Sequence, residues 1–460
     1  MSRASSARAS EGGALGGAGP RLHARALWLA SGACVLVALL ATLWFVAGTI
    51  GVRIPYWGEA EVIYEAARMR AHEPLFIDPI AGTGEVPPSH YFVTYPPLYA
   101  WALSFVPASA ALVVARITCT LAWFGTLGAI AWRSRRIEVA GAAVFIAGIW
   151  VLANFAMLGR PDSIAGAALA VALWRATDGR ARLDPLTVAL FVLVPWLKPT
   201  MLGASVGALL ASRDKRAWGM AIGFALASAL VAGKLLFVHM VESNAQPFAL
   251  SAWLEQVPAR LPFFATLFAW CVWLGRKERI ALGGFVGALA WTLIALAKTG
   301  SSSNYWMEPC IAARVQLARA PRRDYADRRL AGVALATALY ADLASIRGAL
   351  EHRASFRRDA EVVESLRVEC IHVPQDVVAA DEAGIELLLD GRILMPAYQF
   401  SFLAQKGAVP ESLFIEELRA ARCYVEHTGQ LNLLPNVVSE LPRLYEGPAE
   451  RDGFRVWRKR

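Results

Sequence analysis

Hydrophobic residues gather along this chain into long runs that are separated by short polar turns. A helix that spans a membrane needs about 20 mostly apolar residues, and seven of the runs reach or approach that length. They cover residues 27–49, 108–132, 139–157, 164–174, 218–238, 261–274 and 280–297. A further run over 186–212 is interrupted by Pro195, Lys198 and Pro199, which predicts a hairpin of two short helices. With two last segments at 305–317 and 330–346, we expect about eleven spans.

Arginine and lysine gather in alternate turns between these runs, as is typical of cytoplasmic turns in membrane proteins. The basic turns hold Arg133, Arg135, Arg136, Arg175, Arg180, Arg182, Arg213, Lys215, Arg216, Arg276, Lys277 and Arg279, and five arginines between 319 and 329. With the N-terminus inside, the remaining turns face the outer side of the membrane. Every unusual polar motif is therefore predicted on the outer side, including the long loop over 50–107.

Composition agrees with an α-helical polytopic membrane protein, because 56% of the residues are hydrophobic, 18% are charged and the mean hydropathy is +0.42. The net charge of +9 is spread over cytoplasmic turns and two tails. We therefore expect membrane lipids as partners and no nucleic acid. Residues 1–26 predict a disordered cytoplasmic tail, and 27–49 predict an uncleaved first span. The protein is expected to be a multi-pass protein of the inner (plasma) membrane.

The character of the chain changes at about residue 347, where charged residues become frequent and apolar runs become short. Segments 368–373, 377–380 and 385–389 predict short strands, or a strand and a helix, and 410–421 has helical spacing. We expect a transmembrane domain over 27–346 with an outer loop over 50–107, and a small α/β domain over 347–460. Because the N-terminus is expected inside, an odd number of spans places the terminal domain on the outer side of the membrane.

The six cysteines are too few and too scattered to indicate a disulfide framework or a zinc site, since neither a Cys-x-x-Cys nor a His-x-x-x-His pair occurs. No metal site is predicted. Cys370 and Cys423 both lie in the terminal domain. In an oxidising outer compartment they can form a disulfide, and otherwise they are buried thiols.

Two carboxylates, Glu59 and Glu61, stand at the head of the outer loop. Acidic side chains beside a bilayer are costly without a partner or a function, and a catalytic base needs a carboxylate in a partly desolvated site. Two residues apart on a helix, the side chains diverge by about 200°, so that only one faces a given site. We expect Glu59 to be the base and keep Glu61 as the alternative. The competing role for both is favourable interaction with the helix N-terminus.

Basic residues at Arg160, Lys198 and Lys298 fall on the predicted outer side, against the usual orientation bias. A phosphate group explains them, because arginine offers a bidentate fork and lysine a point charge. The alternatives are snorkelling of the lysines to lipid head groups and a structural ion pair between Arg160 and Asp162. The turn over 298–305 is small and rich in hydroxyl groups, which lets backbone N–H groups approach phosphate or sugar oxygens.

These motifs, taken in order, resemble the GT-C superfamily of integral-membrane glycosyltransferases, and in particular its bacterial mannosyltransferase-like and aminoarabinose-transferase-like members. The resemblance covers roughly 27–309. The motifs that carry it are Trp57-Gly58-Glu59, Pro74-Leu75-Phe76, Tyr95-Pro96-Pro97-Leu98-Tyr99, Arg160-Pro161-Asp162, Leu197-Lys198-Pro199-Thr200, and Lys298 followed by Asn304-Tyr305-Trp306-Met307-Glu308.

The resemblance implies a transferase that moves a sugar from a polyprenyl-phosphate donor to a glycan, lipid or protein acceptor on the outer face, with inversion at the sugar carbon. Carried over by position, it implies that Glu59 is the base. The residues it implies for substrate binding are Arg160, Asp162, Lys198, Lys298, Asn304, Tyr305 and Tyr95. Some members bind a divalent cation, a point that this sequence leaves open. Many relatives have paired acidic residues at the head of this loop. Here Gly58 precedes Glu59, so the assignment of the base is open between Glu59 and Glu61.

A transporter or flippase of a lipid-linked sugar is the main alternative, because the proline-interrupted hairpin is also typical of translocation paths. The hydrophobic profile contains no comparable pair of halves, and most charged residues cluster at the ends of the spans. A third alternative, a membrane scaffold without catalysis, leaves the acidic loop unexplained.

Overall fold

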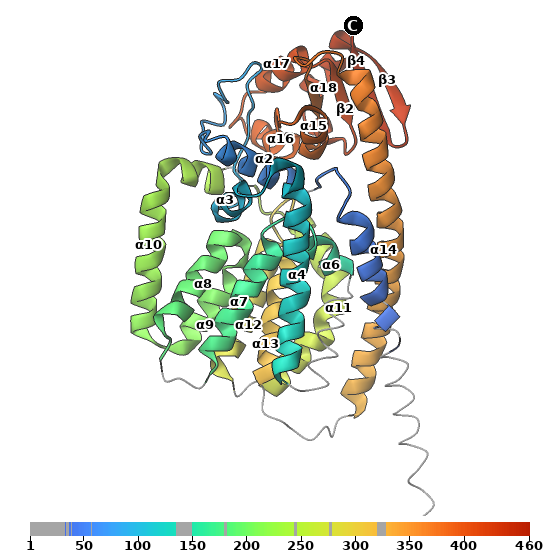
Figure 1. The fold of residues 1–460 in the computed structure, drawn as a ribbon. Coiled ribbons are helices and arrows are strands. Elements are labelled where there is room, and N and C mark those ends of the chain that lie inside the picture. Colours follow the sequence, from blue (N-terminus) through green and yellow to red (C-terminus); the bar gives the residue numbers. More distant parts are fainter. Residues whose placement is uncertain are drawn as a thin grey trace, which may run out of the picture.

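The computed structural model describes residues 33, 36–37, 39–56, 58–134, 150–178, 182–242, 246–275, 278–319 and 328–460. The molecule is a bundle of helices with a small sheet domain at one end (Figure 1). The predicted tail over 1–26, Trp57 and most of the predicted span over 139–157 lie outside the described residues.

Most of the predicted hydrophobic segments correspond to helices. The elements before residue 320 are α2 (Glu59–Arg70), α3 (Leu98–Ser104), α4 (Ala108–Ser134), α6 (Trp150–Ala156), α7 (Asp162–Ala176), α8 (Pro185–Leu197), the 3₁₀ turn η1 (Pro199–Met201), α9 (Gly203–Ser212), α10 (Lys215–Phe237), the π-helical turn η2 (Val238–Glu242), α11 (Leu250–Gly275), α12 (Arg279–Ala295), the 3₁₀ turn η3 (Ser303–Trp306) and α13 (Met307–Arg319). The hairpin predicted over 186–212 is confirmed, since α8 and α9 flank the break at Lys198.

Only part of the expected span count has direct support in the helices that the structure describes. Among them, α4 is long and apolar enough to cross a membrane, and α10 with η2 makes a second such segment if the 108° bend within it is accepted. Four apolar helices are shorter, at 39–49, 185–197, 199–212 and 279–295. Eleven spans therefore remain a prediction.

Close packing between α9 and α12 depends on facing glycines. A Cβ atom on Gly207 would lie 2.2 Å from the carbonyl oxygen of Gly283, and one on Gly203 would lie 2.5 Å from that of Gly287. Both helices thus carry two glycines four residues apart, the spacing with which helices approach backbone to backbone in membranes. This packing holds the second half of the hairpin against α12.

The main apolar core lies within the bundle, where aromatic rings from α11, α12 and η3 meet. The Phe264 and Trp306 ring centroids are 5.4 Å apart, and those of Phe268 and Phe285 are 5.2 Å apart. The polar turn before α13 is thereby anchored by a buried tryptophan.

One long helix, α14 (Arg328–Cys370), joins the bundle to the terminal domain and runs along one side of the molecule (Figure 1). The predicted domain boundary at residue 347 falls inside this helix. The strand expected over 368–373 is wrong, because α14 continues through residue 370. The segment expected as a strand or helix over 385–389 is helical, whereas the strand over 377–380 and the helix over 410–421 are confirmed.

The terminal domain is a four-stranded mixed sheet with short helices, as expected for an α/β unit. Its elements are β1 (Val378–Ala380), α15 (Ala383–Asp390), α16 (Ala397–Gln405), α17 (Ser412–Ala420), β2 (Cys423–Glu426), the 3₁₀ turn η4 (Gln430–Leu433), α18 (Pro435–Leu444), β3 (Tyr445–Arg451) and β4 (Phe454–Lys459). The strand order is β1-β2-β4-β3, with β1 parallel to β2 and the other pairs antiparallel. In register, Val378 faces Cys423 and Val425 faces Val456.

A disulfide joins Cys370 at the end of α14 to Cys423 at the start of β2, with Cα atoms 5.6 Å apart. Of the two alternatives that the sequence left open for these cysteines, a disulfide and two buried thiols, the structure has the disulfide. The bond ties the sheet to the helix that connects it to the bundle.

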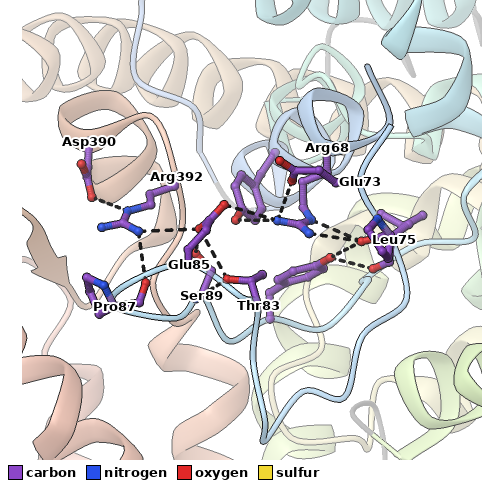
Figure 2. Close-up of polar contacts among 12 residues, drawn as sticks. Arg68, Glu73, Leu75, Thr83, Glu85, Pro87, Ser89, Asp390 and Arg392 are labelled. Atoms are coloured by element: carbon purple, nitrogen blue, oxygen red, sulfur yellow. Dashed lines mark hydrogen bonds and ion pairs between the residues drawn. The ribbon is translucent and has the colours of Figure 1, made fainter. Parts of the chain in front are cut away.

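The terminal domain is also fastened to the loop over 50–107 by charged side chains (Figure 2). The Arg392 guanidinium donates to the Pro87 carbonyl and to Asp390, each at 3.1 Å, and lies 3.6 Å from the Glu85 carboxylate. The other oxygen of Glu85 is 3.8 Å from Arg68 in α2. The loop and the terminal domain therefore lie at the same end of the bundle.

Candidate functional site

The first predicted carboxylate, Glu59, is the first residue of α2 and is fully buried. The Arg116 side chain of α4 donates to both of its oxygens, at 2.8 and 2.7 Å. The backbone N–H groups of Tyr56 and Gly159 donate to it as well, at 2.9 and 2.5 Å. A buried carboxylate that accepts four hydrogen bonds has all its acceptor positions filled and has no face left toward a substrate.

Glu61 follows two residues later, and the helix directs it away from Arg116, as its predicted geometry requires. Burial raises the pKa of Glu61, whereas hydrogen bonds from the backbone and from the Gln399 side chain, together with the Arg160 charge, act in the opposite direction. Its Oε2 atom is buried and accepts no hydrogen bond. Glu61 therefore combines a raised pKa with an unused acceptor atom, which suits proton removal.

Asp162, at the start of α7, is the hub of a second charged group. Its carboxylate accepts from Lys198 Nζ at 3.2 Å and from Asn304 Nδ2 at 2.8 Å, and its other oxygen lies 3.2 Å from Arg160 Nε. All four side chains are buried. Four residues that the sequence placed in three separate outer turns thus meet at one point, and the predicted ion pair between Arg160 and Asp162 is present.

Two cations of this group, Arg160 and Lys198, share the Asp162 carboxylate. Burial would raise the pKa of Asp162, but the Arg160 and Lys198 charges lower it below its ordinary value. Burial lowers the pKa of Lys198 to about 7, against the raising effect of Asp162 and with the further lowering effect of Arg160. Lys198 is therefore close to its protonation midpoint at neutral pH, and an added anion would favour its charged form.

Tyr95 joins the two groups. Its ring lies 4.3 Å from Lys198 Nζ and 5.8 Å from the Arg160 guanidinium, both within range of cation–π attraction. Its hydroxyl faces Gly58, where a Cβ atom would come within 3.0 Å. Gly58 has φ +86°, so this glycine provides both the left-handed turn into α2 and the room for Tyr95.

The predicted hydroxyl-rich turn before α13 closes the site from another side. Asn304 accepts from the Ser302 hydroxyl at 2.6 Å while its amide donates to Asp162. Lys298 is half-buried and pairs by its backbone with Phe248, and its charge contributes to the lowered pKa of Lys198. Tyr305, in η3, is half-buried. All nine predicted site residues therefore belong to one region, at the end of the bundle that carries the terminal domain.

Two residues of this region were missed by sequence reasoning. Arg116 had a visible signal, since it is the one charged residue in the apolar run over 108–132 and a buried charge requires a counter-ion. Gln399 had none, because nothing in the sequence indicates that the terminal domain reaches Glu61.

Metal binding finds no support in the part of the chain that the structure describes, where no group of three or more His, Cys, Asp or Glu side chains can hold an ion.

Crystal structures of ArnT from Cupriavidus metallidurans share this fold. The structure bound to undecaprenyl phosphate matches with a TM-score of 0.56 and the apo structure with 0.55, each at 13% sequence identity over 93% of this chain and 98% of the other. No family model matches the sequence, and no curated protein matches it. At this identity the likeness establishes the fold, namely a mostly helical bundle with a small terminal sheet domain.

Proposed function

We propose that the chain is a membrane glycosyltransferase that moves a sugar from a polyprenyl-phosphate donor to a glycan, lipid or protein acceptor on the outer face. One observation carries this proposal: Glu61 and the cations Arg160 and Lys198 lie in one region. Glu61 is a buried carboxylate whose Oε2 accepts no hydrogen bond, and both cations pair with Asp162. A displacement at a sugar carbon needs these two elements, a base for the nucleophile and cations for the leaving phosphate. The ArnT fold, which one crystal structure shows with undecaprenyl phosphate, supports this donor class.

The reaction that we infer is a single inverting displacement. Glu61 takes the proton of the acceptor hydroxyl as its oxygen attacks the anomeric carbon. The bond between that carbon and the phosphate oxygen breaks, and the electron pair leaves with polyprenyl phosphate. The new glycosidic bond forms on the opposite face of the sugar, and Glu61 ends protonated.

The leaving phosphate is stabilised by Arg160 and Lys198, with Lys298 as a third cation nearby. Because Asp162 already orients both cations, they need little reorganisation as charge develops on the leaving group. Asn304 holds Asp162 in place from the turn before α13. Tyr95 and Tyr305 line the same region, where an aromatic ring can pack on a sugar.

The contacts of Glu59 favour Glu61 as the base. An acceptor hydroxyl that approached Glu59 would have to displace the bidentate bond from Arg116, whereas Glu61 Oε2 has a free position. We assign to Glu59 the role of holding α2 against α4. The sequence-based assignment of the base to Glu59 remains the competing prediction.

The same region, in our proposal, faces the oxidising outer side of the membrane. The disulfide between Cys370 and Cys423 supports this orientation, because such bonds persist outside the cytosol. The terminal domain and the acidic loop lie at the same end of the bundle. If one of them is on the outer side of the membrane, the other is on that side too.

Transfer from labelled polyprenyl-phosphate sugars tests the proposal. Membranes with the wild-type protein, Glu61→Gln and Glu59→Gln are incubated with a panel of such donors, and the label is followed into lipid, glycan and protein fractions. We expect Glu61→Gln to lose transfer by about 100-fold or more, which is the scale of general-base catalysis. Binding of undecaprenyl phosphate should persist in this variant, because the cations are intact.

Glu351→Gln serves as the matched control, since Glu351 is exposed on α14 and pairs with Arg347. It should retain full transfer. Absence of transfer from any donor, together with energised uptake of a substrate, would establish the transporter alternative instead. If only Glu59→Gln loses transfer and this variant is folded, Glu59 is the base.

A further inference from the structure

Glu308 is a fully buried carboxylate near the start of α13. The motif that ends in this residue supplies Asn304 and Tyr305 to the proposed site, but the proposed reaction gives Glu308 no role. Its Oε1 atom accepts a hydrogen bond of 2.7 Å from the backbone N–H of Ala204, the second residue of α9. The first N–H groups of a helix have no acceptor within the helix, so Glu308 supplies the one that Ala204 needs.

The start of α9 is also where the backbone position of Lys198 is set. Lys198 is extended, with φ −146° and ψ 100°, and separates α8 from the turn η1. Its N–H donates to the Val194 carbonyl of α8 at 2.8 Å, and its carbonyl accepts from the N–H of Met201 at 2.9 Å. Between Lys198 and α9 lie η1 and Leu202. A shift of the first turn of α9 therefore moves the backbone of Lys198.

The side chain of Lys198 is held from the same stretch of chain that carries Glu308. Asn304 donates to Asp162 at 2.8 Å, and Asp162 accepts from Lys198 Nζ at 3.2 Å. The turn η3 continues directly into α13, so Asn304 and Glu308 are about one helical turn apart. One of them fixes the counter-ion of Lys198, and the other fixes the helix that follows Lys198.

The start of α9 is fixed from α12 as well. Trp291 Nε1 donates to the Thr200 carbonyl in η1 at 3.1 Å, and Gly203 packs on Gly287. The end of the hairpin break thus lies between two helices that both hold it. A buried carboxylate in a helix bundle is costly unless it has a partner or a function, and Glu308 has its partner at this point.

We propose that Glu308 is a positioning residue for Lys198: by accepting from Ala204 it holds the hairpin break where Lys198 meets Asp162 and the phosphate of the donor. The inference rests on the proposed transferase function and extends it to the lipid-phosphate side of the site. Glu308 itself makes no contact with the substrate in this role. The reach of its acceptor atom to Ala204 matters, and its charge is secondary.

Three variants separate reach from charge. Glu308→Gln keeps an acceptor at the same reach without the charge, Glu308→Asp keeps the charge on a side chain one methylene shorter, and Glu308→Ala removes both. We expect Glu308→Ala and Glu308→Asp to weaken binding of undecaprenyl phosphate by about tenfold, the scale of one hydrogen bond, and Glu308→Gln to stay within about threefold of the wild type. Titration of tryptophan fluorescence with the lipid measures the binding.

Transfer kinetics distinguish positioning from a general loss of folded protein. In Glu308→Ala and Glu308→Asp, KM for the donor should rise and kcat should fall, while KM for the acceptor stays unchanged. A smaller fraction of folded protein would lower kcat alone and would leave KM and lipid affinity as they are. Lipid affinity and donor KM equal to those of the wild type in both variants would overturn the inference, as would loss in Glu308→Gln with none in Glu308→Asp.

Ser205→Ala is the matched control. Ser205 follows Ala204 in α9, is equally buried, and has no hydrogen-bond partner for its hydroxyl in the part of the chain that the structure describes. Removal of this hydroxyl should leave lipid affinity and transfer as in the wild type.

A double-mutant cycle in thermal unfolding needs neither donor nor turnover. Glu308→Ala, or Glu308→Asp if the alanine variant does not fold, is combined with Lys198→Met. If Glu308 positions Lys198, its removal has already loosened the ion pair with Asp162. The shift in melting temperature caused by Lys198→Met should then be smaller by about 2 °C or more in that background.

The same Lys198→Met shift should be unchanged in the Ser205→Ala background. Additive shifts for Glu308 and Lys198 would overturn the inference. If no donor supports transfer, the proposed function fails, and the cycle still decides whether Glu308 positions Lys198.

Discussion

Arg116 of α4 and Glu59 of α2 form a bidentate ion pair in which both side chains are buried. The guanidinium also donates to the carbonyl groups of Thr49 and Ile54, at 2.9 and 2.8 Å, in the segment that leads from the first hydrophobic run to α2. A single arginine therefore gathers the end of one helix, the start of another and the chain between them. This arrangement fixes the position from which Glu61 faces the site.

Removal of one partner of this pair should destabilise the protein strongly. We expect Arg116→Met to reduce the free energy of unfolding by about 3–5 kcal/mol, because Glu59 is left buried without its counter-charge. Thermal unfolding in detergent measures the loss. Arg347→Met, at an exposed pair with Glu351, should change stability by less than about 1 kcal/mol. The double change of Glu59 and Arg116 to Met should recover much of the loss, and an Arg116→Met protein as stable as the wild type would contradict the assignment.

The lowered pKa of Lys198 predicts pH-dependent binding of the lipid phosphate. The ammonium group is present below about pH 7 and is lost above it, so undecaprenyl phosphate should bind more weakly by about tenfold between about pH 6 and about pH 9. Titration of tryptophan fluorescence with the lipid measures this. Lys198→Arg keeps its charge throughout and should flatten the dependence. If the affinity for undecaprenyl phosphate falls equally with pH in both proteins, Lys198 does not titrate in this range.

The glycines between α9 and α12 predict a steric effect of a single methyl group. We expect Gly207→Ala to destabilise the protein by about 1–3 kcal/mol, because the new Cβ atom would lie 2.2 Å from the Gly283 carbonyl oxygen. Gly125→Ala in α4 is the control, since a Cβ atom there meets nothing within 4 Å. It should leave the unfolding temperature equal or slightly higher, as alanine favours a helix over glycine. Equal melting of the two variants would refute close contact of the helices.

The disulfide predicts a specific pattern of thiol reactivity and stability. In the denatured, unreduced protein Cys370 and Cys423 should resist alkylation, and reduction should make both reactive, which mass spectrometry detects. We expect replacement of both by serine to destabilise the terminal domain by about 4 kcal/mol, because the bond closes a loop across 53 residues of sequence separation. Alkylation of both cysteines without reduction would show that they are thiols in the folded protein.

Local pattern explains much of what could be foreseen. The run over 186–212 with its prolines specified the hairpin of α8 and α9, and the apolar run from residue 108 specified α4, since hydrophobic spacing and helix breakers act within a few residues. The failure at 368–373 has a local cause as well. A segment of six residues with four apolar side chains suits a strand or a helix equally, and α14 takes its first three residues into the helix.

The sequence by itself determined which groups were available: two carboxylates at the head of one loop, three cations at the ends of helices, and two cysteines in one domain. Tertiary structure decided which of them meet. Asp162 holds Lys198 and Asn304 because three helix ends converge, and Arg392 reaches Glu85 because the terminal domain lies against the loop over 50–107. A side chain can reveal that it needs a partner, as Arg116 does in its apolar run. The choice of that partner depends on packing between elements that lie far apart in the chain.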